Sequence, residues 1–129
     1  MYNLSKQSYQ RLNGIESILI AILTQSITDS PHDFGIPRNG GLRTADEQNE
    51  LFKKKRSKCN GYTNKSMHQS GLAFDIFIYL PDKTASWDKE KLTEVATHIL
   101  KIAKENFNIE LNWGGNWKNW KDYPHFQMD

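Results

Sequence analysis

Two polar segments, far apart in the chain, contain the residue types of a metal site. The first segment contributes His68 and Asp75, and the second contributes His125. Two imidazoles and one carboxylate can bind one divalent ion, and three protein ligands leave the fourth tetrahedral position open, as in catalytic zinc sites. Asp122, three residues before His125, is a further carboxylate suited to proton transfer. The pattern therefore predicts zinc-dependent amide hydrolysis.

Each of these residues also has a structural interpretation. Asp75 is the only charged residue between positions 71 and 80, and a carboxylate in such a segment is costly unless it is paired or bound to a metal. It could equally lie on the solvated edge of a strand. His125 follows a proline and could be structural, and Asp122 precedes Tyr-Pro and could form a turn. The bare pattern leaves both interpretations open.

Length and composition fit one domain spanning residues 1–129. The chain is 37% hydrophobic and 25% charged, and its net charge of +2 is too small to predict a nucleic-acid partner. A single cysteine, Cys59, excludes an internal disulfide framework and is typical of a reducing compartment. The N-terminus lacks an export-signal pattern, and the longest apolar run, residues 18–23, is too short to cross a bilayer. We expect a cytoplasmic origin and no stable membrane association.

The hydrophobic periodicity predicts three helices and three strands. The helices are expected over about Ser8 to Thr28, Thr44 to about Lys54, and Asp88 to Asn106. The strands are expected over Gly71 to Leu80, Ile109 to Trp113, and His125 to Met128, with extended chain over Phe34 to Leu42. Thr44 and Glu47 fit a capping box at the start of the second helix. Because helices and strands do not alternate regularly, the predicted class is α+β, with a small, largely antiparallel sheet and about three flanking helices.

A basic run, Lys53 to Lys58, follows the second predicted helix. Its simplest interpretation is a solvated helix end whose cations offset the helix dipole. The alternative is an anion-binding patch for a polyanionic cell envelope or a nucleic acid. A nucleophile formed by Cys59 and His68 is a weaker alternative to the metal site. His32 and His98 are interpreted as surface or capping residues.

The residues around the proposed ligands make the pattern specific. Together they resemble the phage endolysin L-alanyl-D-glutamate endopeptidases, which belong with D-alanyl-D-alanine carboxypeptidases and hedgehog-like domains in one zinc-binding superfamily. The resemblance covers about Phe34 to Met128. Its motifs are Gly40-Gly41-Leu42-Arg43-Thr44-x-x-Glu47-Gln48, Ser66-x-His68-x-x-Gly71-x-Ala73-x-Asp75, Trp113-Gly114-Gly115-x-Trp117 and Asp122-x-Pro124-His125-Phe126.

The resemblance implies one Zn²⁺ ion held by His68, Asp75 and His125. It implies that Asp122 acts as general base and then as general acid. It also implies that Arg43 faces the site, where a guanidinium can stabilise an oxyanion.

The resemblance also suggests residues that contact the substrate. These are Ser66, Gln48 and Trp113, of which Gln48 has the least clear role. Trp113 and Trp117 either line the site or pack beneath it in the core.

The implied protein is a zinc metallopeptidase that hydrolyses the L-Ala–D-Glu amide of peptidoglycan stem peptides during phage or prophage host lysis. We expect a monomer without a separate cell-wall-binding domain and without a nucleic-acid partner. It would pass from the host cytoplasm to the wall through a separate pore-forming protein. The alternatives are a D-Ala-D-Ala carboxypeptidase or dipeptidase, and a non-catalytic zinc-containing wall-binding module.

Overall fold

The computed structural model describes all 129 residues and contains helices and short strands in mixed order. The α-helices are α1 (Lys6–Arg11), α2 (Ser17–Thr28), α3 (Ala45–Lys53) and α4 (Lys89–Phe107). The strands are β1 (Asp33–Gly35), β2 (Ala73–Asp75), β3 (Phe77–Tyr79), β4 (Ala85–Ser86), β5 (Asn112–Trp113) and β6 (His125–Gln127). Two short 3-10 helices are η1 (Met67–Ser70) and η2 (Gly114–Asn116). The predicted α+β class is confirmed.

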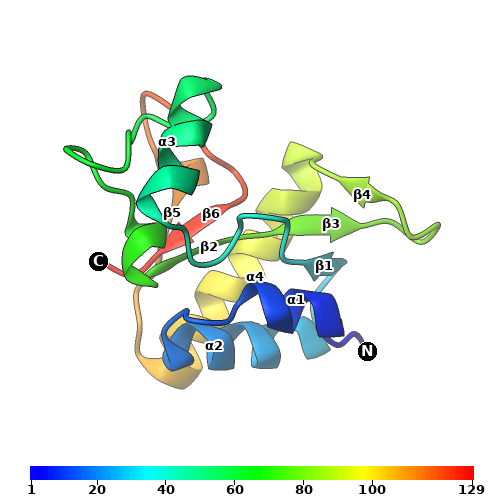
Figure 1. The fold of residues 1–129 in the computed structure, drawn as a ribbon. Coiled ribbons are helices and arrows are strands. Elements are labelled where there is room, and N and C mark those ends of the chain that lie inside the picture. The colour runs from blue at the N-terminus through cyan, green and yellow to red at the C-terminus, as the bar shows by residue number, and fades with distance from the viewer.

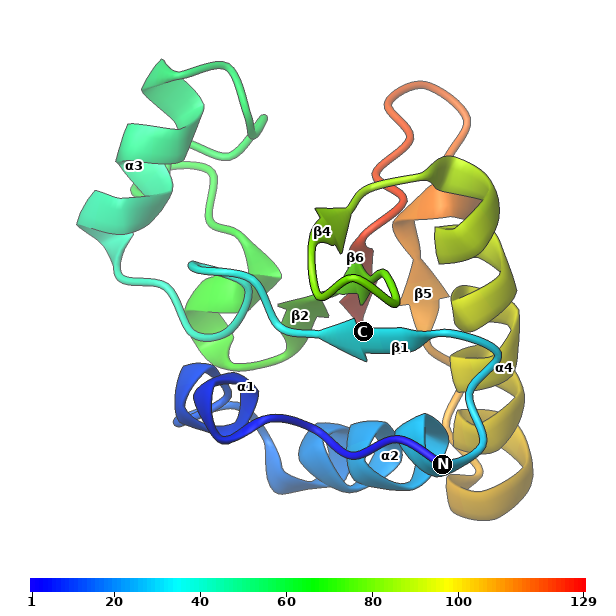
Figure 2. The same ribbon diagram turned by 90° about the vertical axis from the view of Figure 1, so that its right-hand side faces the viewer.

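The strands form two three-stranded sheets rather than one. Their orders are β1-β3-β4 and β2-β6-β5, and every pair is antiparallel, as expected. The long helix α4 and the helix α2 pack against each other and flank the sheets, whereas α3 stands at the opposite side (Figure 1 and Figure 2). No helix is both long enough and apolar enough to cross a bilayer.

The prediction of one strand over Gly71–Leu80 is wrong, because the chain changes sheets at Ile76. The N–H of Asp75 donates to the Gly40 carbonyl (2.8 Å), and the N–H of Ile76 donates to the Pro124 carbonyl (3.0 Å). These bonds to loop segments replace the sheet hydrogen bonds that a continuous strand would make. Asp75 therefore lies at the end of β2, at the junction of the two sheets.

The prediction of one helix over Ser8–Thr28 is also wrong. The chain turns between α1 and α2 at Gly14, whose φ of +90° disfavours any residue with a side chain. After the turn, the N–H of Glu16 donates to the Gly71 carbonyl (3.0 Å). This bond ties the start of α2 to the segment that follows η1.

The other predicted helices begin and end within one or two residues of the expected positions. Thr44 caps α3 with the predicted capping box, in which Glu47 is the second member. Asp88 caps α4 through the backbone N–H of Lys91. The predicted extended segment contains β1, which pairs with β3, and β4 was not predicted because two residues carry no periodic signal.

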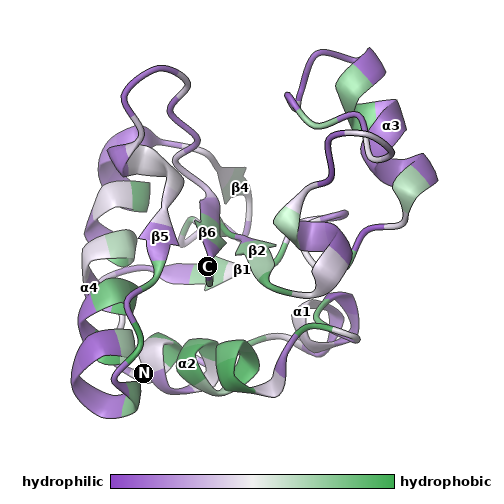
Figure 3. Ribbon diagram, turned by 90° about the vertical axis from the view of Figure 1, so that its left-hand side faces the viewer, coloured by the Kyte–Doolittle hydropathy of each residue, from purple (hydrophilic) through white to green (hydrophobic).

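One hydrophobic core joins α2, α4 and the strands, and Figure 3 shows α2 as the most continuously hydrophobic helix. The segment around α3 contributes nothing to this core, and the only buried residue of α3 is Gln48. Hydrogen bonds from Arg43 to the Asp75 carboxylate and to the His68 carbonyl connect this segment to the rest of the fold. The largest fully buried residues are Phe34, Phe74, Phe126, Leu12, Leu19, Ile22, Leu23, Ile27, Ile36, Ile76, Ile78 and Leu92.

We expect Ile99→Ala to lower the free energy of unfolding by about 2–5 kcal/mol, because it removes a fully buried side chain from the core face of α4. Lys101→Ala, an exposed position on the same helix, should change it by less than about 0.5 kcal/mol. Urea unfolding followed by circular dichroism gives both values. Equal losses in the two variants would show that α4 is not held by this core.

Candidate functional site

The pairing of β2 with β6 places two of the predicted ligands opposite each other. In the antiparallel register, Asp75 faces His125 and Phe74 faces Phe126. The two phenylalanines are completely buried, and their rings stack with centroids 5.1 Å apart. A slip of one residue would turn the whole set to the opposite face, so burial of the phenylalanine pair fixes the position of Asp75 and His125.

The third predicted ligand, His68, comes from η1 and is buried. The Ser66 side chain accepts a hydrogen bond from the His68 N–H (3.2 Å), and the Gln69 side chain accepts one from the Ser66 N–H (2.9 Å). Gly71 ends this turn in the left-handed conformation, with φ +73°. The capped turn therefore fixes the His68 ring beside the end of β2.

The three predicted ligand atoms form a nearly equilateral triangle. The His68 Nε2 lies 3.1 Å from the His125 Nδ1 and 3.2 Å from the Asp75 Oδ1, and the His125 Nδ1 lies 3.2 Å from the same oxygen. Tetrahedral ligands about 2.1 Å from zinc lie roughly 3.4 Å from one another, slightly farther apart than these three atoms. The spacing therefore fits one small tetrahedral ion.

Hydrogen bonds on the outer side of each ring determine which nitrogen faces the triangle. The His68 Nδ1–H donates to the Gly41 carbonyl (2.9 Å), and the His125 Nε2–H donates to the Gln127 Oε1 (2.8 Å). In its neutral form, each ring then presents an unprotonated nitrogen to the other ligands. Three lone pairs, two from nitrogen and one from oxygen, then point toward one position, where they can coordinate a cation.

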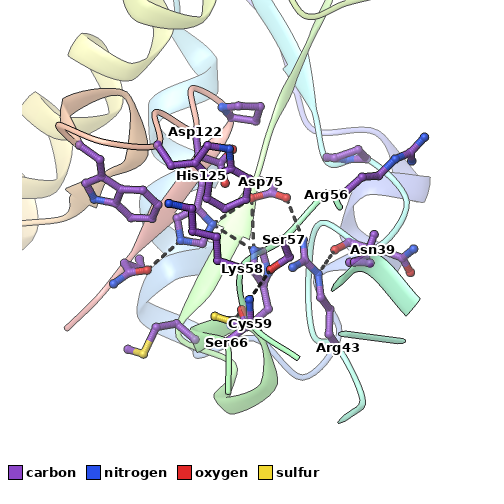
Figure 4. A pocket seen from close by; sticks show the side chains of 18 of the residues that line it. Asn39, Arg43, Arg56, Ser57, Lys58, Cys59, Ser66, Asp75, Asp122 and His125 are labelled. Carbon is purple, nitrogen blue, oxygen red and sulfur yellow. Dashed lines mark hydrogen bonds and ion pairs between the residues drawn. The ribbon is translucent and has the colours of Figure 1, made fainter. Parts of the chain in front are cut away.

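Arg43 holds the second oxygen of the Asp75 carboxylate. The Arg43 guanidinium donates to the Asp75 Oδ2 (3.0 Å), to the Gln48 Oε1 (3.0 Å) and to the Asn39 carbonyl (2.8 Å). Figure 4 shows Arg43 and His125 on opposite sides of Asp75. The prediction that Arg43 lies at the site agrees with its position, and the structure adds a contact that orients a ligand.

Gln48, predicted to contact substrate, lies away from the cavity. It is fully buried, and its amide donates to the Ser57 hydroxyl (2.7 Å) and the Cys59 carbonyl (2.9 Å). Its oxygen accepts from Arg43. Gln48 thus links the segment after α3 to Arg43 and does not line the cavity, so the structure shows no position from which it would contact a substrate there.

The electrostatics of the cluster favour an anionic Asp75. Burial alone would raise the pKa of this carboxyl, but the nearby His68 and His125 hold it well below its usual range. Burial would lower the pKa of His125, and the hydrogen bond and charge of Asp75 outweigh that effect and raise it. The site therefore keeps a full negative charge on Asp75 across the physiological pH range, ready to bind a cation.

Asp122 lines the same cavity and comes from the loop between η2 and β6. Burial raises the pKa of Asp122, and the negative charge of Asp75 adds to the rise. Its N–H donates to the Gly114 carbonyl (3.0 Å), and a Cβ on Gly114 would lie 2.2 Å from the Asp122 carbonyl oxygen. Only glycine allows this approach, which explains why the Trp-Gly-Gly segment accompanies Asp122.

The two tryptophans of that segment have different positions. Trp113 is buried in the core beneath the site, where its indole N–H donates to the Tyr123 carbonyl (2.8 Å). Trp117 lines the cavity, with its ring centroid 5.3 Å from that of His125. Of the two positions expected for Trp113, lining the site or packing beneath it, the structure shows the second, because its ring is part of the core and does not line the cavity.

The cavity has a volume of about 990 Å³ and contains all three predicted ligands, Arg43, Ser66 and Asp122. Cys59 also lines it but forms no hydrogen bond with His68 through its thiol. His32 and His98 lie elsewhere and pair with Glu94 and Asp29. Gln127 was missed by sequence reasoning, although its place two residues after His125 puts both on the same face of β6.

Comparison with known proteins agrees with this geometry. A family model described as phage L-alanyl-D-glutamate peptidase matches residues 1–128, and the chain belongs to this family. The Bacillus subtilis (strain 168) peptidoglycan L-alanyl-D-glutamate endopeptidase CwlK is 34% identical over 98 residues, which cover 68% of this chain. That match spans only 57% of CwlK.

Two solved structures share the fold. The Serratia marcescens L-Ala D-Glu endopeptidase ChiX superposes with a TM-score of 0.84 at 27% identity, covering 99% of this chain and 90% of ChiX. The L,D-carboxypeptidase DacB from Streptococcus pneumonia gives a TM-score of 0.53 at 14% identity, covering 92% of this chain and 68% of DacB. The likeness to DacB concerns the fold alone.

We expect Gln127→Leu to weaken the binding of added Zn²⁺, used as a probe of the candidate metal site, by about 10- to 100-fold, because His125 loses the acceptor that holds its Nε2–H outward. Gln25→Leu makes the same change at an exposed position of α2 and should leave the affinity unchanged. Competition titration with a chromophoric chelator measures both affinities. An unaltered affinity in Gln127→Leu would show that this hydrogen bond does not orient the ligand.

Proposed function

We propose that the protein is a zinc peptidase that hydrolyses the L-Ala–D-Glu amide of peptidoglycan stem peptides. The observation that carries the proposal is the triangle of ligand atoms from His68, Asp75 and His125, which lines a cavity together with the half-buried carboxylate of Asp122. Family membership and the names of CwlK and ChiX support the choice of bond. One Zn²⁺, held by the three ligands, would polarise the scissile carbonyl and make water more acidic.

Asp122 is the proposed proton carrier. Its raised pKa brings the carboxyl nearer to the range in which it can both accept and return a proton. It would take a proton from the attacking water and deliver it to the amine that leaves. The Asp122 carboxylate makes no hydrogen bond within the protein and lines the cavity, so its oxygens are available to the reactants.

Arg43 is the proposed electrostatic partner of the reacting carbonyl. One N–H of its NH1 group donates to Gln48, and one N–H of its NH2 group donates to Asp75. Each of these two nitrogens carries a second N–H, which is free to bind a substrate. A fixed guanidinium stabilises negative charge that develops on the carbonyl oxygen. Ser66, at the cavity wall, is the proposed contact for the peptide backbone.

The proposed biological setting is phage or prophage lysis of a bacterial host. The protein would act as a monomer with residues 1–129 forming one catalytic domain, and a separate pore-forming protein would release it from the cytoplasm to the wall. These points rest on the family and on the sequence.

Mass spectrometry of purified peptidoglycan tests the reaction directly. Incubation should release peptides that begin at D-Glu, and a zinc chelator should abolish the release. Loss of a terminal D-Ala would instead indicate a carboxypeptidase. Stoichiometric zinc without any cleavage would indicate a wall-binding module.

We expect Asp122→Asn to retain zinc and to lose about 10²- to 10⁴-fold in turnover, because the amide cannot carry the proton. Asp82→Asn, in the exposed turn between β3 and β4, is the matched control and should keep full activity. Fragment release and metal content are measured on the same samples. Undiminished turnover in Asp122→Asn would remove this residue from the mechanism.

A further inference from the structure

The cavity that contains the proposed metal site has a strongly unequal charge. Its acidic lining residues are Asp75 and Asp122. Its basic lining residues are Arg38, Arg43, Arg56, Lys58, Lys65 and Lys118. The whole chain has a net charge of only +2, so positive charge is concentrated around this one opening.

Only Arg43 among these cations forms an ion pair, with Asp75. The other five, which we term the basic rim, are exposed and form no ion pair within the protein. The basic rim consists of Arg38, Arg56, Lys58, Lys65 and Lys118. These cations come from separate parts of the chain. Arg38 precedes α3, Arg56 and Lys58 follow it, Lys65 precedes η1, and Lys118 follows η2. Their convergence on one cavity is a property of the fold and does not follow from the run Lys53–Lys58 alone.

The opening continues beyond the metal ligands over the basic run. A second hollow of about 550 Å³ shares Ser57, Lys58 and Trp120 with the cavity. The Lys58 ammonium lies 5.3 Å from the centre of the Trp120 ring, so the two side chains form part of one wall. Figure 4 labels Arg56 and Lys58 among the side chains that line the pocket together with Asp75. The basic run therefore faces space in which a ligand can lie.

We infer that the basic rim binds the free carboxylates beside the scissile amide and makes the unamidated stem peptide the preferred substrate. The inference rests on the proposed function. In a stem peptide, D-Glu is joined to the next residue through its γ-carboxyl, so its α-carboxylate is adjacent to the amide to be cleaved. A diaminopimelate residue that follows D-Glu adds a second carboxylate. These anions would lie within the cavity when the amide reaches the ligands.

The arrangement favours small anions over a long polyanion. A nucleic acid needs cations spread along a surface that tracks its backbone. Here the cations surround a hollow that ends at His68, Asp75 and His125. Single exposed ion pairs are weak, but several cations that converge on one carboxylate act together and improve both encounter and positioning.

The test compares two synthetic substrates that differ in one group. Both are L-Ala-γ-D-Glu-diaminopimelate peptides, one with the free D-Glu α-carboxylate and one with the α-amide. We expect amidation to lower kcat/KM by about tenfold, mainly through KM. Equal kcat/KM values would overturn the inference while leaving the proposed function intact.

A charge-matched pair of variants assigns the effect to the basic rim. The triple variant Lys58→Gln, Lys65→Gln and Lys118→Gln should lose about tenfold on the free substrate and little on the amide. The control variant Lys6→Gln, Lys83→Gln and Lys101→Gln removes the same charge at exposed positions outside the cavity and should keep the preference. An equal loss in both triple variants would overturn the assignment.

Binding of the product γ-D-Glu-diaminopimelate, measured by calorimetry, separates this inference from the proposed reaction. Tighter binding of the free acid than of its α-amide, lost only in the cavity variant, supports the inference even if no peptide is cleaved. Equal binding of acid and amide, with duplex DNA bound in a manner that depends on these lysines, would overturn it in favour of a polyanion surface.

Discussion

The structure depends most on the register between β2 and β6. This pairing sets Asp75 opposite His125, and one step along the strands it sets Phe74 opposite Phe126 in the core. Burial of the two phenylalanine rings stabilises this register of the strands. The same register places the Asp75 and His125 side chains opposite each other at the end of the strands. The change of sheet at Ile76 follows directly, because β2 must end where Asp75 reaches the cavity. The register of β2 and β6 therefore determines both the packing of the core and the position of the proposed metal ligands.

Around that pair, hydrogen bonds orient His68, Asp75 and His125 as a ligand set. Gly41 and Gln127 hold the outer N–H groups of the two rings, and Arg43 holds the outer oxygen of Asp75. Each outer bond leaves one lone pair directed inward. Because Gln48 connects Arg43 to the segment after α3, a part of the chain with no place in the hydrophobic core still contributes to the order of the site. The same segment carries cations that face the cavity.

Sequence reasoning predicted what depends on composition and periodicity, and missed what depends on tertiary contacts. The capping box at Thr44, the helix after Asp88 and the class of the fold follow from local signals. The change of sheet at Ile76 does not, because hydrogen bonds to distant loops make it. The turn at Gly14 combines a positive φ with the bond from the Glu16 N–H to the Gly71 carbonyl, which periodicity does not reveal. The proposed ligands converge as expected, whereas Gln48 and Trp113 lie outside the cavity. Both belong to motifs that accompany the site, and sequence spacing alone cannot distinguish a residue that supports a site from one that lines it.

The central claim is that one metal ion is held by His68, Asp75 and His125. X-ray diffraction from crystals of the zinc-loaded protein, recorded on both sides of the zinc absorption edge, tests it most directly. The account predicts one anomalous peak, about 2.1 Å from the His68 Nε2, the His125 Nδ1 and the Asp75 Oδ1. A peak at another cluster, a ligand set that includes Cys59, or no peak at stoichiometric zinc would contradict it.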